Sequence, residues 1–97
     1  MGMSKFSRQE RNEVYEKALQ LWGCKAQATV AIEEMSEVIK EITKMLRGEL
    51  DREHMAEEIA DATIMLEQLR QMLNINDSVD SWMDYKVAAL KRKVEKE

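Results

Sequence analysis

The sequence contains no proline, only three glycines and a single cysteine among its 97 residues. Because β-sandwiches and barrels turn at many glycines and prolines, this composition excludes a chain built from short strands. Cys24 has no second cysteine to pair with, so we expect no internal disulfide and a reducing, cytoplasmic location. No apolar run approaches the ~20 residues of a membrane-spanning helix, and the first residues lack the apolar core of a signal peptide, so we expect no membrane association.

The chain also lacks an excess of basic charge. Its 15 Lys and Arg against 19 Asp and Glu give a formal net charge of -4, which predicts no attraction to DNA, RNA or anionic membranes. The hydrophobic fraction of 44% is too high for a disordered chain. The length allows one domain, residues 1–97, in which we expect residues 1–6 to be flexible. Because so short a chain buries a modest share of its surface, oligomerisation is expected.

Apolar residues recur at spacings of three and four, which predicts four amphipathic helices. They run from a Ser7-x-x-Glu10 capping box to a stop at Gly23, from about Lys25 to Arg47 with a stop at Gly48, from an Asp51 cap to about Leu73, and from a cap at Asp77 or Ser78 to the C-terminus. The connections are short, so the sequence predicts an all-α, antiparallel four-helix-type bundle. The third helix is apolar on more than one side, which favours completion of the bundle in a homodimer or homotetramer.

Two acidic clusters of matching pattern stand on the second and third predicted helices. Glu34 and Glu37 are three residues apart and share a helix face, as do Glu58 and Asp61. If the helices pack antiparallel, four carboxylates converge, and their repulsion requires protons or a cation. Oxygen ligands of this kind suit Mg²⁺ or Mn²⁺. The alternative is that these acids are solvated, since 35% of the chain is charged.

The motif Glu33-Glu34-x-x-Glu37, followed after a spacer by Glu58-x-x-Asp61, resembles the signature of the MazG-like all-α nucleoside triphosphate pyrophosphohydrolases. The stretch 57–69, Trp22-Gly23, Gln27 and the basic last helix are also similar to small members of that superfamily, so the resemblance covers about positions 20 to 94. It implies an enzyme that hydrolyses the α–β phosphoanhydride of an NTP or dNTP with Mg²⁺, giving the monophosphate and pyrophosphate.

The resemblance also implies roles for individual residues. The metal ligands are expected to be Glu34, Glu37, Glu58 and Asp61. Glu33 is a further catalytic candidate that could orient water, and Glu57 is a candidate for the same duty; either is alternatively solvated. The candidates for substrate binding are Trp22, Gln27, Lys44, Arg47 and Lys86. The last helix has no Asn beside Lys86, unlike many members of the superfamily, which leaves the phosphate and sugar contacts undetermined.

Several residues have a structural alternative to a functional role. Trp22 could stack on a base or belong to the core, and the three basic side chains could be solvated. His54 is expected to be an exposed first-turn residue, and Cys24 a buried, inert thiol. The alternative function is a non-catalytic helical oligomeric interaction module, or a nucleotide sensor on the same fold.

Overall fold

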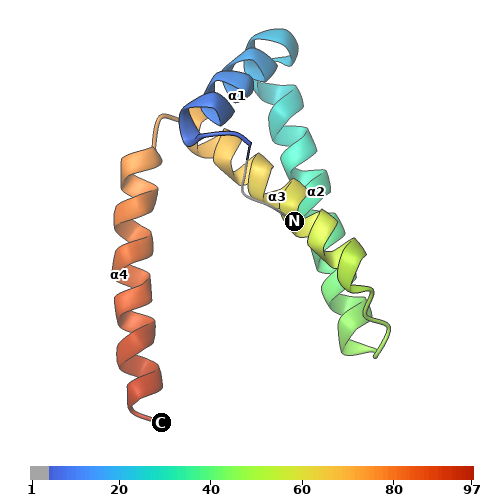
Figure 1. Ribbon diagram of the computed structural model, residues 1–97, viewed down its shortest axis with the longest axis vertical. Coiled ribbons are helices and arrows are strands. Elements are labelled where there is room, and N and C mark those ends of the chain that lie inside the picture. Colours follow the sequence, from blue (N-terminus) through green and yellow to red (C-terminus); the bar gives the residue numbers. More distant parts are fainter. Residues whose placement is uncertain (1–4) are drawn as a thin grey trace.

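The computed structural model describes residues 5–97, and these fold into helices without any strand. In chain order the helices are α1 (Arg8–Trp22), α2 (Cys24–Leu46), α3 (Arg52–Met72) and α4 (Asn76–Glu95) (Figure 1). The predicted all-α class is therefore confirmed for the described residues. None of the helices in this range combines the length and apolarity needed to cross a membrane. Of the segment predicted to be flexible, residues 1–4 lie outside the described range.

The predicted start and end of α1 are confirmed. Ser7 Oγ accepts a hydrogen bond from the Glu10 N–H at 3.1 Å, and Glu10 Oε1 accepts one from the Ser7 N–H at 3.0 Å. The hydrogen bond from the Ser7 N–H, together with one from the Ser7 side chain, favours the charged carboxylate and lowers the pKa of Glu10. Gly23 ends α1 with φ of 87°, a backbone conformation that glycine adopts without strain. Because α2 begins at the next residue, a single glycine makes the corner between the two helices.

The start of α3 agrees with the prediction, whereas the start of α4 does not. Asp51 Oδ1 accepts a hydrogen bond from the His54 N–H at 3.1 Å and so caps α3. We predicted a cap at Asp77 or Ser78, but α4 begins at Asn76 and has no side-chain cap. Arg70 anchors this end instead, donating to Asn76 Oδ1 and Asn76 O at 3.0 Å each and to Asp80 at 2.5 Å.

Helices α2 and α3 form an antiparallel pair, and α1 packs against both at one end of it (Figure 1). The buried apolar side chains are few and come from all three helices: Tyr15, Ala31, Ala62 and Met65. Alanine at two of these positions lets α2 and α3 approach closely. The polar residues between the same helices therefore lie near one another, and this places the candidate site.

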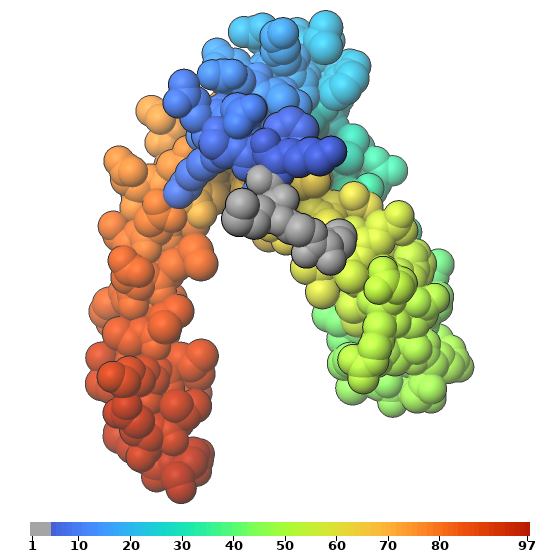
Figure 2. Space-filling model, in the orientation of Figure 1, coloured from blue at the N-terminus to red at the C-terminus, as the bar shows by residue number. Residues whose placement is uncertain are grey.

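Helix α4 stands apart from the other three. It packs only on α3, at its own first turn, where Asp80 also lies 3.8 Å from Arg8 of α1. From there it projects away from the other helices (Figure 1), leaving an open space between α4 and the α2–α3 pair (Figure 2). Its apolar residues Trp82, Met83, Val87, Leu90 and Val94 are 55–62% exposed. The chain by itself therefore packs three of the four helices, and the four-helix packing expected from the sequence is not completed within it.

Tyr15 of α1 forms a hydrogen bond with α3, and the loss of its hydroxyl should lower the stability by a measurable amount. Its hydroxyl donates to a Glu67 carboxylate oxygen, and burial, followed by the hydrogen bond to Glu67 and the charge of that residue, raises the pKa of Tyr15 to about 12. Tyr15→Phe should lower the free energy of unfolding by about 1–2 kcal/mol near neutral pH. A urea titration measures this loss.

The pH dependence of the same variant has a definite sign. The folded state holds the Tyr15 proton up to about pH 12, whereas the unfolded chain loses it near the ordinary tyrosine pKa of 10.0. The stabilisation is therefore fully present below about pH 10 and is lost as the pH rises toward 12. The difference between wild type and Tyr15→Phe should shrink over that window. Tyr85→Phe, at a 60% exposed position on α4, is the matched control and should leave the stability unchanged.

Candidate metal centre

Six polar residues repeat at intervals of seven along the interface between α2 and α3. They are Gln27, Glu34 and Glu41 on α2, and His54, Asp61 and Gln68 on α3. Seven residues make nearly two helical turns, so each set of three lies on one face of its helix. Glu34 lies near Asp61, Glu41 bonds His54, and Gln27 and Gln68 line one pocket. We name this arrangement the polar ladder, which has three rungs.

The middle rung carries the closest group of carboxylates. One oxygen from each of Glu34, Glu58 and Asp61 lies within 4.8 Å of the other two. Glu58 is 8% exposed, and the other two side chains are half-buried. Partial burial, repulsion by Asp61 and Glu58, a hydrogen bond shared with Asp61 and repulsion by Glu37 all raise the pKa of Glu34. A proton or a cation relieves this repulsion, and the oxygen donors suit Mg²⁺ or Mn²⁺.

The remaining predicted carboxylates lie around this group. Glu37 is half-buried and close enough to raise the pKa of Glu34, but it lies outside the group of three. Glu33 is exposed. Glu57 is also exposed, and its carboxylate lies within 4.8 Å of His54 and Glu58 ligand atoms. The structure thus brings together three of the four expected ligands, with Glu37 beside them.

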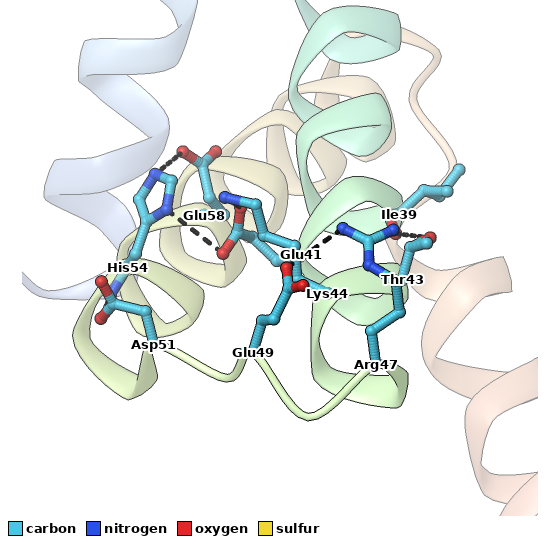
Figure 3. A network of polar contacts seen from close by, with 9 residues as sticks. All are labelled: Ile39, Glu41, Thr43, Lys44, Arg47, Glu49, Asp51, His54 and Glu58. Atoms are coloured by element: carbon cyan, nitrogen blue, oxygen red, sulfur yellow. Dashed lines mark hydrogen bonds and ion pairs between the residues drawn. The ribbon is translucent and has the colours of Figure 1, made fainter.

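His54 links the middle rung to the next (Figure 3). Its Nδ1 lies 3.2 Å from Glu41 Oε1 and its Nε2 lies 3.1 Å from Glu58 Oε1. Each ring nitrogen therefore has one carboxylate partner, one from α2 and one from α3. The prediction that His54 is exposed is wrong, because these contacts hold it half-buried between α2 and α3.

Glu41 is the most buried of the site's carboxylates, at 2% exposure, and it was not predicted. Its Oε1 faces His54, and its Oε2 lies 3.4 Å from Lys44 Nζ, an ion pair without hydrogen-bond geometry. The available signal was its position seven residues after Glu34. In a chain with many charged residues, that spacing alone does not separate a buried acid from a solvated one.

The predicted substrate-binding residues are dispersed. Lys44 is engaged with Glu41, and Arg47 is exposed and pairs with Glu49 at 3.3 Å. Trp22 is 64% exposed, so it does not belong to the core of this chain. Lys86 lies on α4, where its Nζ is 5.7 Å from the centre of the Trp82 ring, and α4 does not contact α2.

Gln27 and Cys24 lie near the opposite end of the helix pair from His54. Gln27 is 6% exposed and lines a pocket. Cys24 was predicted to be buried, and this is wrong. It is the first residue of α2, directly after the Gly23 corner, and its exposed Sγ lies 3.0 Å from Met72 Sδ.

The crowding at Glu34 predicts how stability depends on pH in the absence of metal. Because its pKa is raised in the folded state, the folded chain holds this proton more tightly than the unfolded chain does. Ionised Glu34 therefore destabilises the fold as the pH rises above the ordinary carboxyl range. In EDTA, Glu34→Gln should melt at a higher temperature than wild type near about pH 8, and the difference should shrink toward about pH 5.

Differential scanning calorimetry across this pH range is the measurement, and Glu33→Gln is the matched control at an exposed neighbouring acid. Equal melting temperatures for wild type and Glu34→Gln near about pH 8 would contradict the predicted repulsion.

No family model matches this chain, and no curated protein or solved structure matches it either.

Proposed function

We propose that this protein is a Mg²⁺-dependent nucleoside triphosphate pyrophosphohydrolase, which cleaves the α–β phosphoanhydride of an NTP or dNTP. The observation that carries the proposal is the convergence of Glu34, Glu58 and Asp61 oxygens within 4.8 Å of one another. Three carboxylates at that separation repel one another and repel a polyphosphate. A divalent cation removes both obstacles, since it is attracted to the acids and to the phosphates alike.

The carboxylates of the site have two proposed roles, metal binding and acceptance of a proton. Glu34, Glu58 and Asp61 would hold Mg²⁺ or Mn²⁺, with Glu37 as the fourth ligand suggested by the motif. The bound cation would supply Lewis-acid polarisation of the phosphate and acidify a water molecule. The water oxygen forms a bond to phosphorus, the bridging P–O bond breaks, and the water proton passes to a carboxylate. Glu37 and Glu33 are the candidates for that acceptor, because neither belongs to the group of three.

The rung at His54 supports the same site. A carboxylate that binds a metal needs its orientation fixed by a second partner. His54 holds Glu58 from α3, and Glu41 of α2 holds His54 in turn, so both helices of the pair fix the position of one ligand. Lys44, proposed from the sequence as a phosphate contact, balances the charge of Glu41 in this arrangement.

The active form is proposed to be a homodimer or homotetramer. The exposed apolar face of α4 is what supports this, because covering it in a second copy completes the four-helix packing expected from the sequence. A second copy could also supply the phosphate contacts of Lys86, which lies away from the carboxylates of its own chain. Light scattering after gel filtration measures the oligomeric state, and a monomer at all concentrations would contradict this part of the proposal.

The proposed activity is tested by pyrophosphate release. The protein is incubated with each of the common NTPs and dNTPs and Mg²⁺ or Mn²⁺, inorganic pyrophosphatase is added, and phosphate is measured colorimetrically. Release of pyrophosphate from at least one nucleotide, abolished by EDTA, is the expected result. Absence of metal-dependent release from every nucleotide would overturn the proposal.

A second candidate is a non-catalytic helical interaction module, and the projecting α4 favours it. An interaction module uses the apolar face of α4 and leaves the carboxylates as surface charge. It therefore predicts no thermal stabilisation by Mg²⁺ or nucleotide, whereas a metal-binding enzyme is stabilised by both. A nucleotide sensor on this fold shares the stabilisation but shows no turnover, so the two measurements together separate the three possibilities.

A further inference from the structure

A pocket of about 260 Å³ opens where the start of α1 meets the connection between α3 and α4 (Figure 1). Its lining consists of three arginines, two asparagines and one acid: Arg8, Arg11, Arg70, Asn12, Asn76 and Glu67. The whole chain has a formal net charge of -4, so three arginines at one pocket are a local exception. Guanidinium groups stay charged and donate hydrogen bonds without accepting any. The pocket therefore presents positive charge and hydrogen-bond donors.

The start of α4 adds to this character. Asn76 is the first residue of α4 and lines the pocket, and α4 has no side-chain cap. The first N–H groups of a helix have no partner within the helix, and the positive end of the helix dipole lies there. Arginine side chains and an uncapped helix start are both groups that bind phosphate oxygens.

Glu67 neutralises the arginines only in part. Its carboxylate accepts a hydrogen bond from Tyr15 and lies 3.5 Å from Arg11 Nη1, so it is divided between two partners. It is the one acid among the six lining residues. Three arginines against one glutamate leave the lining an excess of two positive charges.

Asp80 of α4 is the other acid that approaches these arginines. Its carboxylate lies 2.5 Å from Arg70 Nη2 but 3.8 Å from Arg8 Nη2, which is beyond hydrogen-bond distance. Arg70 uses its Nε and Nη2 for Asn76 and Asp80, and its Nη1 has no hydrogen-bond partner among residues 5–97. The arginines therefore keep donors for a ligand, and the exposed Asp80 side chain is placed to compete with that ligand.

The size and charge of the pocket select the kind of ligand. Its volume lies below the ~300–1,000 Å³ of pockets for drug-sized ligands, so it suits a small ion better than a whole nucleotide. An anion with two negative charges matches the excess of two positive charges. Planar guanidinium groups pair their donors with the oxygens of phosphate groups, and this geometry favours a phosphate oxyanion.

This pocket is separate from the candidate metal centre. Glu67 precedes Gln68 of the polar ladder by one residue, which places it about 100° further around α3. The pocket therefore opens on a different face of α3 from the ladder. It shares no residue with the group formed by Glu34, Glu58 and Asp61.

We propose that the pocket between α1, α3 and α4 binds a small phosphate oxyanion, inorganic phosphate or pyrophosphate, and that Asp80 competes with the oxyanion for Arg8 and Arg70. Because α4 packs only on α3 and does so at its first turn, the oxyanion binds at the attachment of α4. The site needs neither a metal nor catalysis, so its test is independent of the proposed function.

Isothermal titration of the metal-free protein near pH 8 with sodium phosphate, and separately with sodium pyrophosphate, tests the site. Sodium chloride at the same ionic strength is the control for screening. Wild type should bind at least one of the two, and the titration that gives binding identifies the oxyanion. Arg8→Gln should weaken binding by about tenfold, because it removes a charged donor. Arg52→Gln, the same change at an exposed position of α3, should bind as wild type does. Absence of binding, or equal affinity in Arg8→Gln and wild type, would overturn the proposed site.

Asp80→Asn separates a competitor from a purely structural ion pair. Removing this charge should tighten oxyanion binding by about fivefold, the effect expected for one unit charge at about 4 Å in water. Asp84→Asn, the same change one turn later on α4, should alter the affinity far less. Unchanged or weaker binding by a folded Asp80→Asn protein would overturn the competition. If that variant does not fold, ¹⁵N-labelled wild type decides: phosphate or pyrophosphate should shift the Asp80 amide and Arg70 Nε signals, and unmoved signals would overturn the proposed site.

Discussion

Replacement of Asp61 by Asn should reduce metal-dependent pyrophosphate release by at least ~100-fold, because a metal-held charge supplies several kcal/mol of catalysis and each 1.36 kcal/mol is a factor of ten in rate. Asp61 contributes an oxygen to the group formed with Glu34 and Glu58. The substitution keeps the shape of the side chain and removes its charge. Steady-state kinetics at saturating Mg²⁺ measure the loss, and circular dichroism should be unchanged.

Asp84→Asn is the matched control, since it removes one acid from an exposed position of α4. It should keep wild-type activity. Mg²⁺ should also raise the melting temperature of Asp84→Asn but not of Asp61→Asn. Full activity in a folded Asp61→Asn protein would contradict the assignment of this residue as a metal ligand.

Glu37→Gln distinguishes two roles for the acid beside the group of three. If Glu37 is a ligand, the variant should lose both activity and stabilisation by Mg²⁺. If Glu37 accepts the water proton, activity should fall while stabilisation by Mg²⁺ persists. Wild-type values for both would remove Glu37 from the site.

The second large effect concerns His54. His54→Leu should lower the free energy of unfolding by about 2 kcal/mol, because it leaves two buried carboxylates, Glu41 and Glu58, without their imidazole partner. Glu41 is 2% exposed and Glu58 is 8% exposed, so water cannot replace the imidazole fully. The loss is partial because Lys44 remains 3.4 Å from Glu41. Urea unfolding monitored by circular dichroism measures the loss.

A second substitution tests the cause of that loss. Glu41→Leu in the His54→Leu background should recover part of the stability, since it removes the uncompensated acid rather than another favourable contact. His54→Gln, which keeps one donor, should lie between wild type and His54→Leu. If the double variant is less stable than His54→Leu alone, the buried charge of Glu41 is not the cause.

Helix positions could be predicted well from this sequence, since the signals that set them are local. The Ser7 capping box, the Gly23 corner and the Asp51 cap are each formed within a few residues, and all three are present. The start of α4 was misjudged because the side chain that holds it, Arg70, belongs to the preceding helix. The orientation of α4 could not be predicted from the sequence either. Periodicity shows that a helix has an apolar face, but it does not show which surface covers that face.

Some residues of the candidate site could likewise be predicted from the sequence, and others could not. The spacing of Glu34, Glu58 and Asp61 on two predicted helices was enough to expect their approach. The roles of Glu41 and His54 were missed, because burial of a charged side chain is decided by partners on another helix. In both cases the sequence did hold a clue, since each lies seven residues from a residue that was already singled out.

The seven-residue spacing of the polar ladder makes its rungs depend on residue count within the helices rather than on the loops between them. Deleting one residue between Gln27 and Glu34 would rotate one rung by about 100° relative to the other and separate the glutamine pocket from the carboxylates. The turn at 47–51 joins the far ends of α2 and α3 and contains no member of the ladder, so added residues there leave the rungs in phase. Natural variation in the length of this protein should therefore be confined to the connections between helices and to the ends of the chain.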